Sequence, residues 1–136
     1  MANYMGTCRT NYFRVTDEAA YQKLFGKLIG EDDIHDFTKE DDGVTYHGFG
    51  CYGCIGFEDG SGVSSIDDFF DELQKILPDG EAFVFMEGGH EKLRYVIGCV
   101  DIVTKDKKEF MDIQTYALQH ARKMLRDPGF ETELEY

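Results

Sequence analysis

Tryptophan is absent from this 136-residue chain, and proline occurs only twice, at positions 78 and 128. No stretch approaches the roughly 18 consecutive apolar residues that a spanning helix needs, so a transmembrane helix is excluded. Because no Ser/Gly linker divides the chain, we expect one domain over residues 1–136. The first residues also lack the basic and apolar regions of a secretory signal peptide, which predicts a cytoplasmic protein.

Basic side chains are scarce as well. The sequence has 14 Lys+Arg against 27 Asp+Glu, which gives a formal net charge of −13 with His neutral. A surface of that sign repels phosphate groups, which excludes direct binding to nucleic acid or to an anionic membrane. Hydrophobic residues make up 42% of the chain, enough to build a core, so the sequence is not a disordered acidic tail.

Hydrophobic spacing predicts an alternation of strands and helices. The first helix has Thr16 as N-cap and Gly30 at its C-terminal cap, and the second is capped by Ser64 or Ser65. Residues 87–91 are expected to form a turn between the last two strands. The expected elements are strands at 12–15, 34–38, 44–50, 82–86 and 93–104, and helices at 17–28, 66–77 and 113–125.

This order is β-α-β-β-α-β, followed by a further strand and helix. We therefore expect an α+β fold, with an antiparallel sheet of about five strands and the helices on one face. The first six elements match a ferredoxin-like βαββαβ core, to which the C-terminal strand and helix are added. Within it, Asp42-Gly43 is a hairpin signal between the second and third strands.

Apolar stripes orient the last two helices toward the core. In the second helix the stripe comprises Ile66, Phe69, Phe70, Leu73, Ile76 and Leu77. In the last helix, which Asp112 caps, the expected inward stripe comprises Ile113, Tyr116, Ala117, His120, Ala121, Met124 and Leu125.

The negative charge is concentrated in the middle of the chain. Residues 29–91 have 17 acidic and two basic residues, a net charge of −15, whereas the remainder has 10 acidic and 12 basic residues. Acidic positions four apart in the second helix share its solvent face, opposite the phenylalanines. The candidate partner-binding carboxylates are Glu31, Asp32, Asp33, Asp36, Glu40, Asp41, Asp42, Asp67, Asp68, Asp71 and Glu72.

Two interpretations of this acidic segment remain open. One is a solvated face that serves solubility. The other is an acidic protein–protein interaction domain whose partner is a basic, nucleic-acid-binding protein. Carboxylates on a helix and adjoining loops can imitate DNA, which carries about one charge per 1.7 Å of axis. Such binding is non-enzymatic, is fast and weakens with salt.

Thiol chemistry offers an alternative centred on Cys51 and Cys54, which form a CxxC pair. In the cytosol the four cysteines are expected as thiols or metal ligands rather than disulfides. The pair could hold zinc with His47 as a third ligand, cycle as a dithiol, or be two ordinary cysteines in a glycine-rich strand. No nucleophile-elbow, P-loop, HExxH or GxGxxG signature occurs, so no catalytic residue is predicted.

A small-ligand-binding domain is the third interpretation. Residues 48–56 alternate glycine with bulkier side chains, which favours bulges or the close approach of another molecule to the backbone. The turn at His90 is expected to contribute to the same site. Arg9, Asn11 and Arg14 are expected to shape a secondary surface.

Four segments, Thr7–Phe13, Gly48–Gly53, Leu73–Pro78 and His90–Tyr95, resemble small acidic proteins of Gram-positive phages and integrative mobile elements, a group without an assigned activity. The resemblance covers most of the chain. It implies a context in which small acidic proteins disarm host defence, as anti-restriction and anti-CRISPR proteins do. It transfers no functional residue to this sequence.

Overall fold

The computed structural model describes residues 4–62 and 64–135 and shows an α+β fold with a mainly antiparallel sheet. The three helices are α1 (Glu18–Phe25), α2 (Ile66–Gln74) and α3 (Ile113–Leu125). The strands are β1 (Met5–Thr10), β2 (Leu28–Gly30), β3 (Ile34–Asp36), β4 (Lys39–Asp41), β5 (Val44–Tyr46), β6 (Phe49–Tyr52), β7 (Ile55–Phe57), β8 (Ala82–Glu91), β9 (Tyr95–Thr104) and β10 (Lys108–Asp112). None of the described helices is long and apolar enough to span a membrane.

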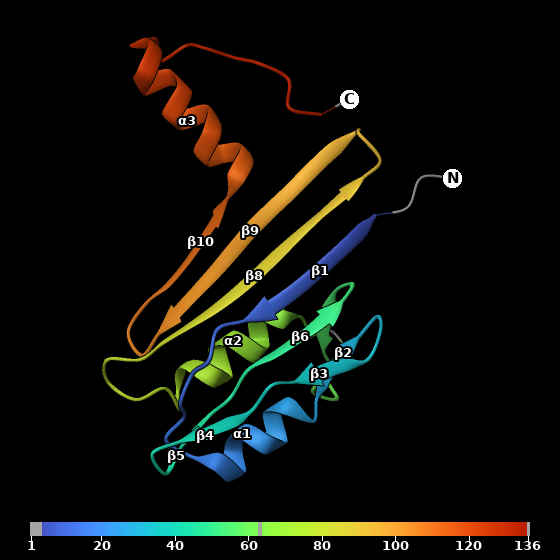
Figure 1. Cartoon of the computed structure of the whole chain (residues 1–136), viewed down its shortest axis with the longest axis vertical. Coiled ribbons are helices and arrows are strands. Elements are labelled where there is room, and N and C mark those ends of the chain that lie inside the picture. The colour runs from blue at the N-terminus through green and yellow to red at the C-terminus, as the bar shows by residue number, and fades with distance from the viewer. Residues whose placement is uncertain (1–3, 63, 136) are drawn as a thin grey trace.

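Six strands form the main sheet in the order β10-β9-β8-β1-β6-β3 (Figure 1), and the pairs β2-β7 and β4-β5 form two small sheets. Each pairing in the main sheet is antiparallel. The ferredoxin-like arrangement is not confirmed. That core is an antiparallel sheet, as here, but the main sheet has six strands, and β2, β4, β5 and β7 interrupt the expected order of elements and lie in the two small sheets.

The core lies between the main sheet and helices α1 and α2. The predicted stripe of α2 is confirmed, because Phe69, Phe70 and Leu73 are buried. Phe83 of β8 is fully buried and contacts the rings of Phe13, Phe49, Phe69, Phe70 and Phe85. Aromatic burial thus holds α2 against the sheet and fixes the position of its acidic outer face.

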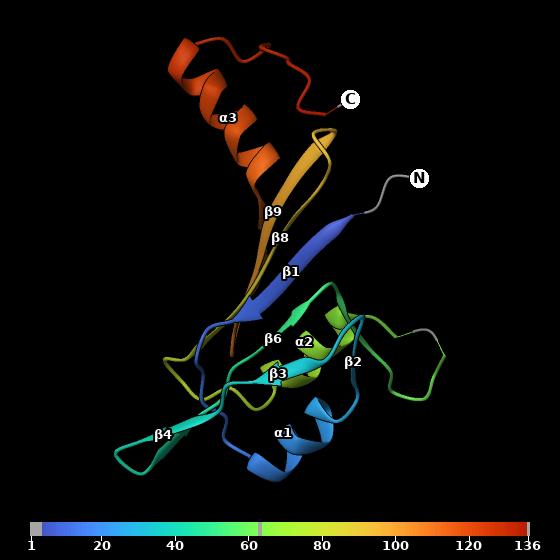
Figure 2. The ribbon, with the colours of Figure 1, turned by 45° about the vertical axis from the view of Figure 1, so that its right-hand side comes forward.

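Helix α3 does not lie with the other two. Figure 2 shows α1 and α2 beside one half of the sheet and α3 beyond the opposite end. Its first residue, Ile113, packs against Gly98, which faces away from α1 and α2. The prediction that all helices cover one face is therefore wrong, and so is the inward stripe of the last helix, since α3 has no buried residue.

The first strand and first helix also differ from prediction. The strand is Met5–Thr10 and not 12–15, because long-range pairing with β6 and β8 decides strand formation where local propensity is weak. Asp17, not Thr16, caps α1 by accepting the Ala20 amide at 3.0 Å. Gly30 lies in β2 and does not cap the helix.

Glycines at 88 and 89 continue β8 where a turn was predicted. Gly88 pairs with Thr7 and Gly98, and Gly89 lies under the ring of Tyr4, where a methyl group would collide. The actual turn follows Glu91, and the chain then adds β10, which the sequence did not predict. The Asp42-Gly43 turn is confirmed, with φ of 55° and 78°, but it joins β4 to β5.

Candidate functional site

The eleven candidate carboxylates lie in three places around the half of the molecule that contains α1 and α2. One group occupies the β2–β3 turn and β3, the second the tip of the β4–β5 hairpin, and the third the outer face of α2. The hairpin tip and the β2–β3 turn lie at opposite ends of this half in both views (Figures 1 and 2). The structure therefore does not gather all eleven into one cluster.

The carboxylates of α2 do meet others. Asp68, Asp71 and Glu72 line a hollow of about 470 Å³ together with Asp59 from the loop after β7. Its remaining lining comprises Lys27, Leu24 and Phe57. Asp59 follows Glu58 in the sequence, several residues before α2. The sequence therefore did not predict that Asp59 lies beside the carboxylates of α2.

Local hydrogen bonds hold this acidic hollow in shape. The backbone amide of Ser65 donates to Oδ2 of Asp68 at 2.9 Å, which fixes the first turn of α2. Hydrogen bonds from Ser61 lower the pKa of Asp59, so its carboxylate is charged over a wide pH range. The apolar stem of a bound cationic side chain would find Leu24 and Phe57 in the same hollow.

Few cations neutralise the acidic surface. Among the described residues, only two of the eleven candidates have an ion-pair partner, namely Asp71 with Lys108 and Glu72 with Lys75. Burial raises the pKa of Asp101, and the neighbouring charge of Asp67 raises it further. This part of the surface therefore carries an excess of negative charge that a basic partner can neutralise.

The proposed zinc ligands are not brought together. His47 is buried in the core, with Nε2 2.7 Å from Oε2 of Glu18 and Nδ1 3.3 Å from Oγ1 of Thr38. Both ring nitrogens are thus engaged away from Cys51 and Cys54. Over residues 4–62 and 64–135, no group of three His, Cys, Asp or Glu side chains is arranged to hold a metal ion.

Cys8, Cys54 and Cys99 have environments that favour the protonated thiol. Cys8 lies directly opposite Cys51 on the neighbouring strand, and both are buried. Burial raises the pKa of Cys8 to about 12 and that of Cys54 to about 11. Because the thiolate is the nucleophile, these shifts disfavour nucleophilic chemistry at Cys8 and Cys54 near neutral pH.

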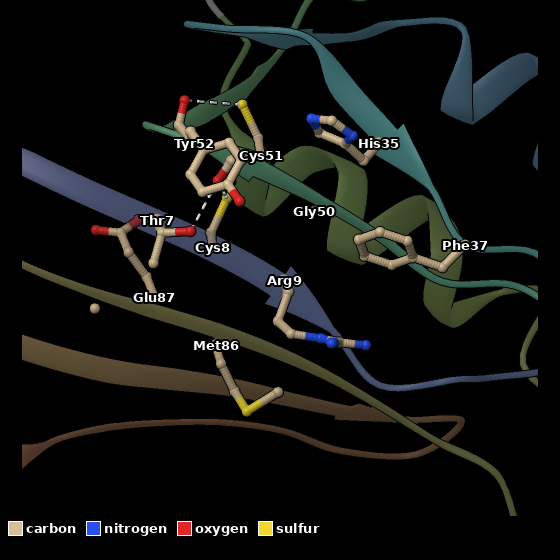
Figure 3. A pocket seen from close by; sticks show the side chains of 11 residues that line it. Thr7, Cys8, Arg9, His35, Phe37, Gly50, Cys51, Tyr52, Met86 and Glu87 are labelled. Atoms are coloured by element: carbon tan, nitrogen blue, oxygen red, sulfur yellow. Dashed lines mark hydrogen bonds between the residues drawn. The ribbon is translucent and has the colours of Figure 1, made fainter.

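A second hollow lies on the sheet face that α1 and α2 leave open. It has a volume of about 520 Å³ and is lined by residues of β1, β3, β6 and β8 (Figure 3). The guanidinium of Arg9 lies over the ring of Phe37 at 5.1 Å from its centroid, and His35 makes an edge contact with Tyr52. Gly50 provides the floor between them, since a methyl group there would crowd the Cys8 carbonyl.

Sequence reasoning had identified Gly50 and Arg9 but not Phe37 or Met86, which also line this open-face hollow. The glycine alternation of residues 48–56 was the signal for Gly50, and the structure adds that Thr7 and Arg9 face away from the buried Cys8 along β1. Which strands flank β1 is a matter of topology, which that alternation does not determine.

Comparison with protein-family models, curated proteins and solved structures returned no match for this chain.

Proposed function

We propose that this chain is an acidic protein–protein interaction domain, and that the hollow beside α2 receives a basic side chain of its partner. The observation that carries the proposal is the convergence of Asp59, Asp68, Asp71 and Glu72 on one hollow. Lys27 lines the same hollow, and Asp71 and Glu72 also pair with Lys108 and Lys75, so among the described residues Asp59 and Asp68 are the two of these four carboxylates without an ion pair. The apolar floor suits the stem of an arginine or lysine, and the rim suits its charged end.

The most suitable partner is a basic protein that ordinarily binds nucleic acid. Its groove is lined with cations spaced for phosphates, and carboxylates on α2 and the adjoining loops present charges of the same sign. The net charge of −15 on residues 29–91 adds long-range attraction. The resemblance to proteins of phages and mobile elements suggests a host-defence protein as the target, in the manner of anti-CRISPR or anti-restriction proteins.

The test measures binding of a fluorescent nona-arginine peptide by anisotropy. The triple variant Asp68→Asn/Asp71→Asn/Glu72→Gln is expected to weaken binding by about tenfold or more, because three charges near the bound cation are removed. Raising salt from about 50 to about 200 mM is expected to weaken wild-type binding steeply and the variant less.

A matched control is available at the hairpin tip. Glu40→Gln/Asp41→Asn/Asp42→Asn changes the net charge by the same amount, far from the hollow. It is expected to weaken peptide binding by no more than about twofold through the general field. Equal losses in the two triple variants would show that overall charge alone attracts the peptide, and the hollow would then not be the site.

The open-face hollow supports a second candidate function, the binding of a small aromatic anion. Its volume lies within the range of about 300–1,000 Å³ typical of ligand sites. Arg9 supplies a cation, and the rings of Phe37 and Tyr52 supply stacking surfaces.

An anilinonaphthalene sulfonate titration tests this candidate. Arg9→Gln is expected to weaken binding of the dye about fivefold or more, because it removes the charge that pairs with the sulfonate. Lys23→Gln on α1 makes the same change of charge outside the hollow and is expected to leave the affinity unchanged. Wild-type affinity in Arg9→Gln would exclude this hollow as an anion site.

A further inference from the structure

The last third of the chain exposes an unusual amount of apolar surface. We define the arm as residues 92–135, which contain β9, β10 and α3. Among the described residues, nine of the fifteen exposed large apolar side chains belong to this arm. They are Leu93, Val96, Phe110, Met111, Ile113, Tyr116, Met124, Leu125 and Leu134.

Most of these side chains are contiguous. Two shallow hollows share Ile113, one beside β10 with Met111 and Tyr116, and the other beside β9 with Leu93, Val96 and Leu134. These six side chains expose on the order of 600 Å², the upper end of the largest apolar patch on a typical monomer. A surface of this size in one place indicates an interface rather than scattered exposure.

Helix α3 extends the patch. Its stripe of Tyr116, His120 and Met124 follows helical spacing, and the rings of Tyr116 and His120 stack with centroids 4.9 Å apart. Met124 is 80% exposed. With Met124 the patch approaches the area of about 800 Å² per partner that a stable protein interface buries. The apolar face of α3 is thus left exposed in the single chain.

The charge distribution indicates which molecule can cover the apolar patch. Residues 92–136 contain eight acidic and eight basic residues, so the arm is neutral and the full charge of −13 lies on residues 1–91. Two arms can therefore meet without net repulsion, and the acidic parts of the two chains then point away from each other (Figure 1).

The ends of α3 are complementary to each other. Asp112 is the N-cap, and Lys123 lies eleven residues later, about three turns along the same flank of the stripe. When two such helices pack antiparallel, equivalent flanks face each other, so Asp112 of one copy comes near Lys123 of the other. A two-fold axis that passes beside His120 and Tyr116 places Asp112 of each copy near Lys123 of the other.

We propose that two copies of this chain associate through their arms, with the α3 helices packed antiparallel about a two-fold axis. The interface is isologous, since the same apolar patch is contributed by each copy. It is separate from the hollow beside α2 and does not depend on the function proposed there.

Sedimentation velocity at micromolar concentration tests the proposal on the full chain. Wild type is expected to sediment as a dimer of twice 15.6 kDa. Met124→Glu is expected to raise the dimer dissociation constant about tenfold or more, because each copy then buries a carboxylate in the apolar contact. Gln22→Glu on α1 is the control, because it adds the same charge to an exposed side chain outside the arm, and it is expected to leave the dimer unchanged.

Circular dichroism of both variants is expected to match wild type, because both side chains are exposed in the single chain. A wild-type monomer at these concentrations would overturn the proposal. So would equal weakening by Met124→Glu and Gln22→Glu, or persistence of the dimer in Met124→Glu. Since apolar burial holds the dimer, it is expected to persist at about 500 mM salt, whereas peptide binding to the acidic hollow is expected to be lost there.

Discussion

Replacing Phe83 with alanine is expected to lower the free energy of unfolding by about 3–5 kcal/mol, enough to leave much of a marginally stable domain unfolded. Phe83 is fully buried, and its ring lies 5.0 Å from that of Phe13 and 5.7 Å from that of Phe70. These contacts join β8 to α2 and to the segment before α1, so the cavity left by the ring cannot close by a local shift. Urea denaturation followed by circular dichroism measures the change.

Phe110→Ala is the matched control, since it removes the same ring from a side chain that is 62% exposed on β10. At concentrations where the chain is monomeric, its effect is expected to be below about 0.5 kcal/mol. Similar losses in the two variants would mean that the aromatic cluster around Phe83 is not the centre of the core.

Gly30→Ala is expected to be the most damaging of the glycine substitutions in the small sheet, with a loss of about 2–3 kcal/mol. A methyl group at Gly30 would overlap the backbone carbonyl of Asp32 and approach Sγ of Cys51 at 2.9 Å. The carbonyl belongs to the β2–β3 turn, which cannot move without disturbing the pairing of β3 with β6. Thermal unfolding gives the measurement.

Gly56→Ala is the comparison for Gly30→Ala, because both glycines lie in the same two-stranded ladder, in β7 and β2. The nearest atom to a methyl group at Gly56 is 3.9 Å away, an ordinary contact. This variant is expected to be neutral or slightly stabilising, because alanine restricts the unfolded chain. A larger loss at Gly56 than at Gly30 would contradict the packing described for the β2–β3 turn.

Sequence patterns of a few residues correctly predicted the elements that depend on interactions between near neighbours in the sequence. The α2 stripe with Phe69 and Leu73, the N-cap Asp112 and the turn at Asp42-Gly43 are each decided within a few residues, and each is confirmed. β1 is different. Its residues have mixed strand propensity, and its pairing partners are distant in the sequence, so no short window could locate it.

The last helix shows a second limit of sequence reasoning. The spacing of Ile113, Tyr116 and Met124 predicts an apolar face and nothing about what covers that face. A covering element in the same chain and one in another chain have the same sequence pattern. The same holds for the carboxylates, because spacing places Asp68 and Glu72 on one helix face and cannot show that Asp59 lies beside them.

The central place of β1 also has a consequence for how the chain folds. Cys8 of β1 donates a hydrogen bond to Cys51 of β6, 43 residues away, and Val84 of β8 donates one to Asn11, just after β1, 73 residues away. Contacts of such long range make folding slow, because the intervening loop must close before the contact gives any stability. Until β8 has been synthesised, β1 lacks one of its neighbours, and its open edge is exposed to pairing with other chains. The first strand of the sequence therefore gains its second neighbour only after β8 has been made.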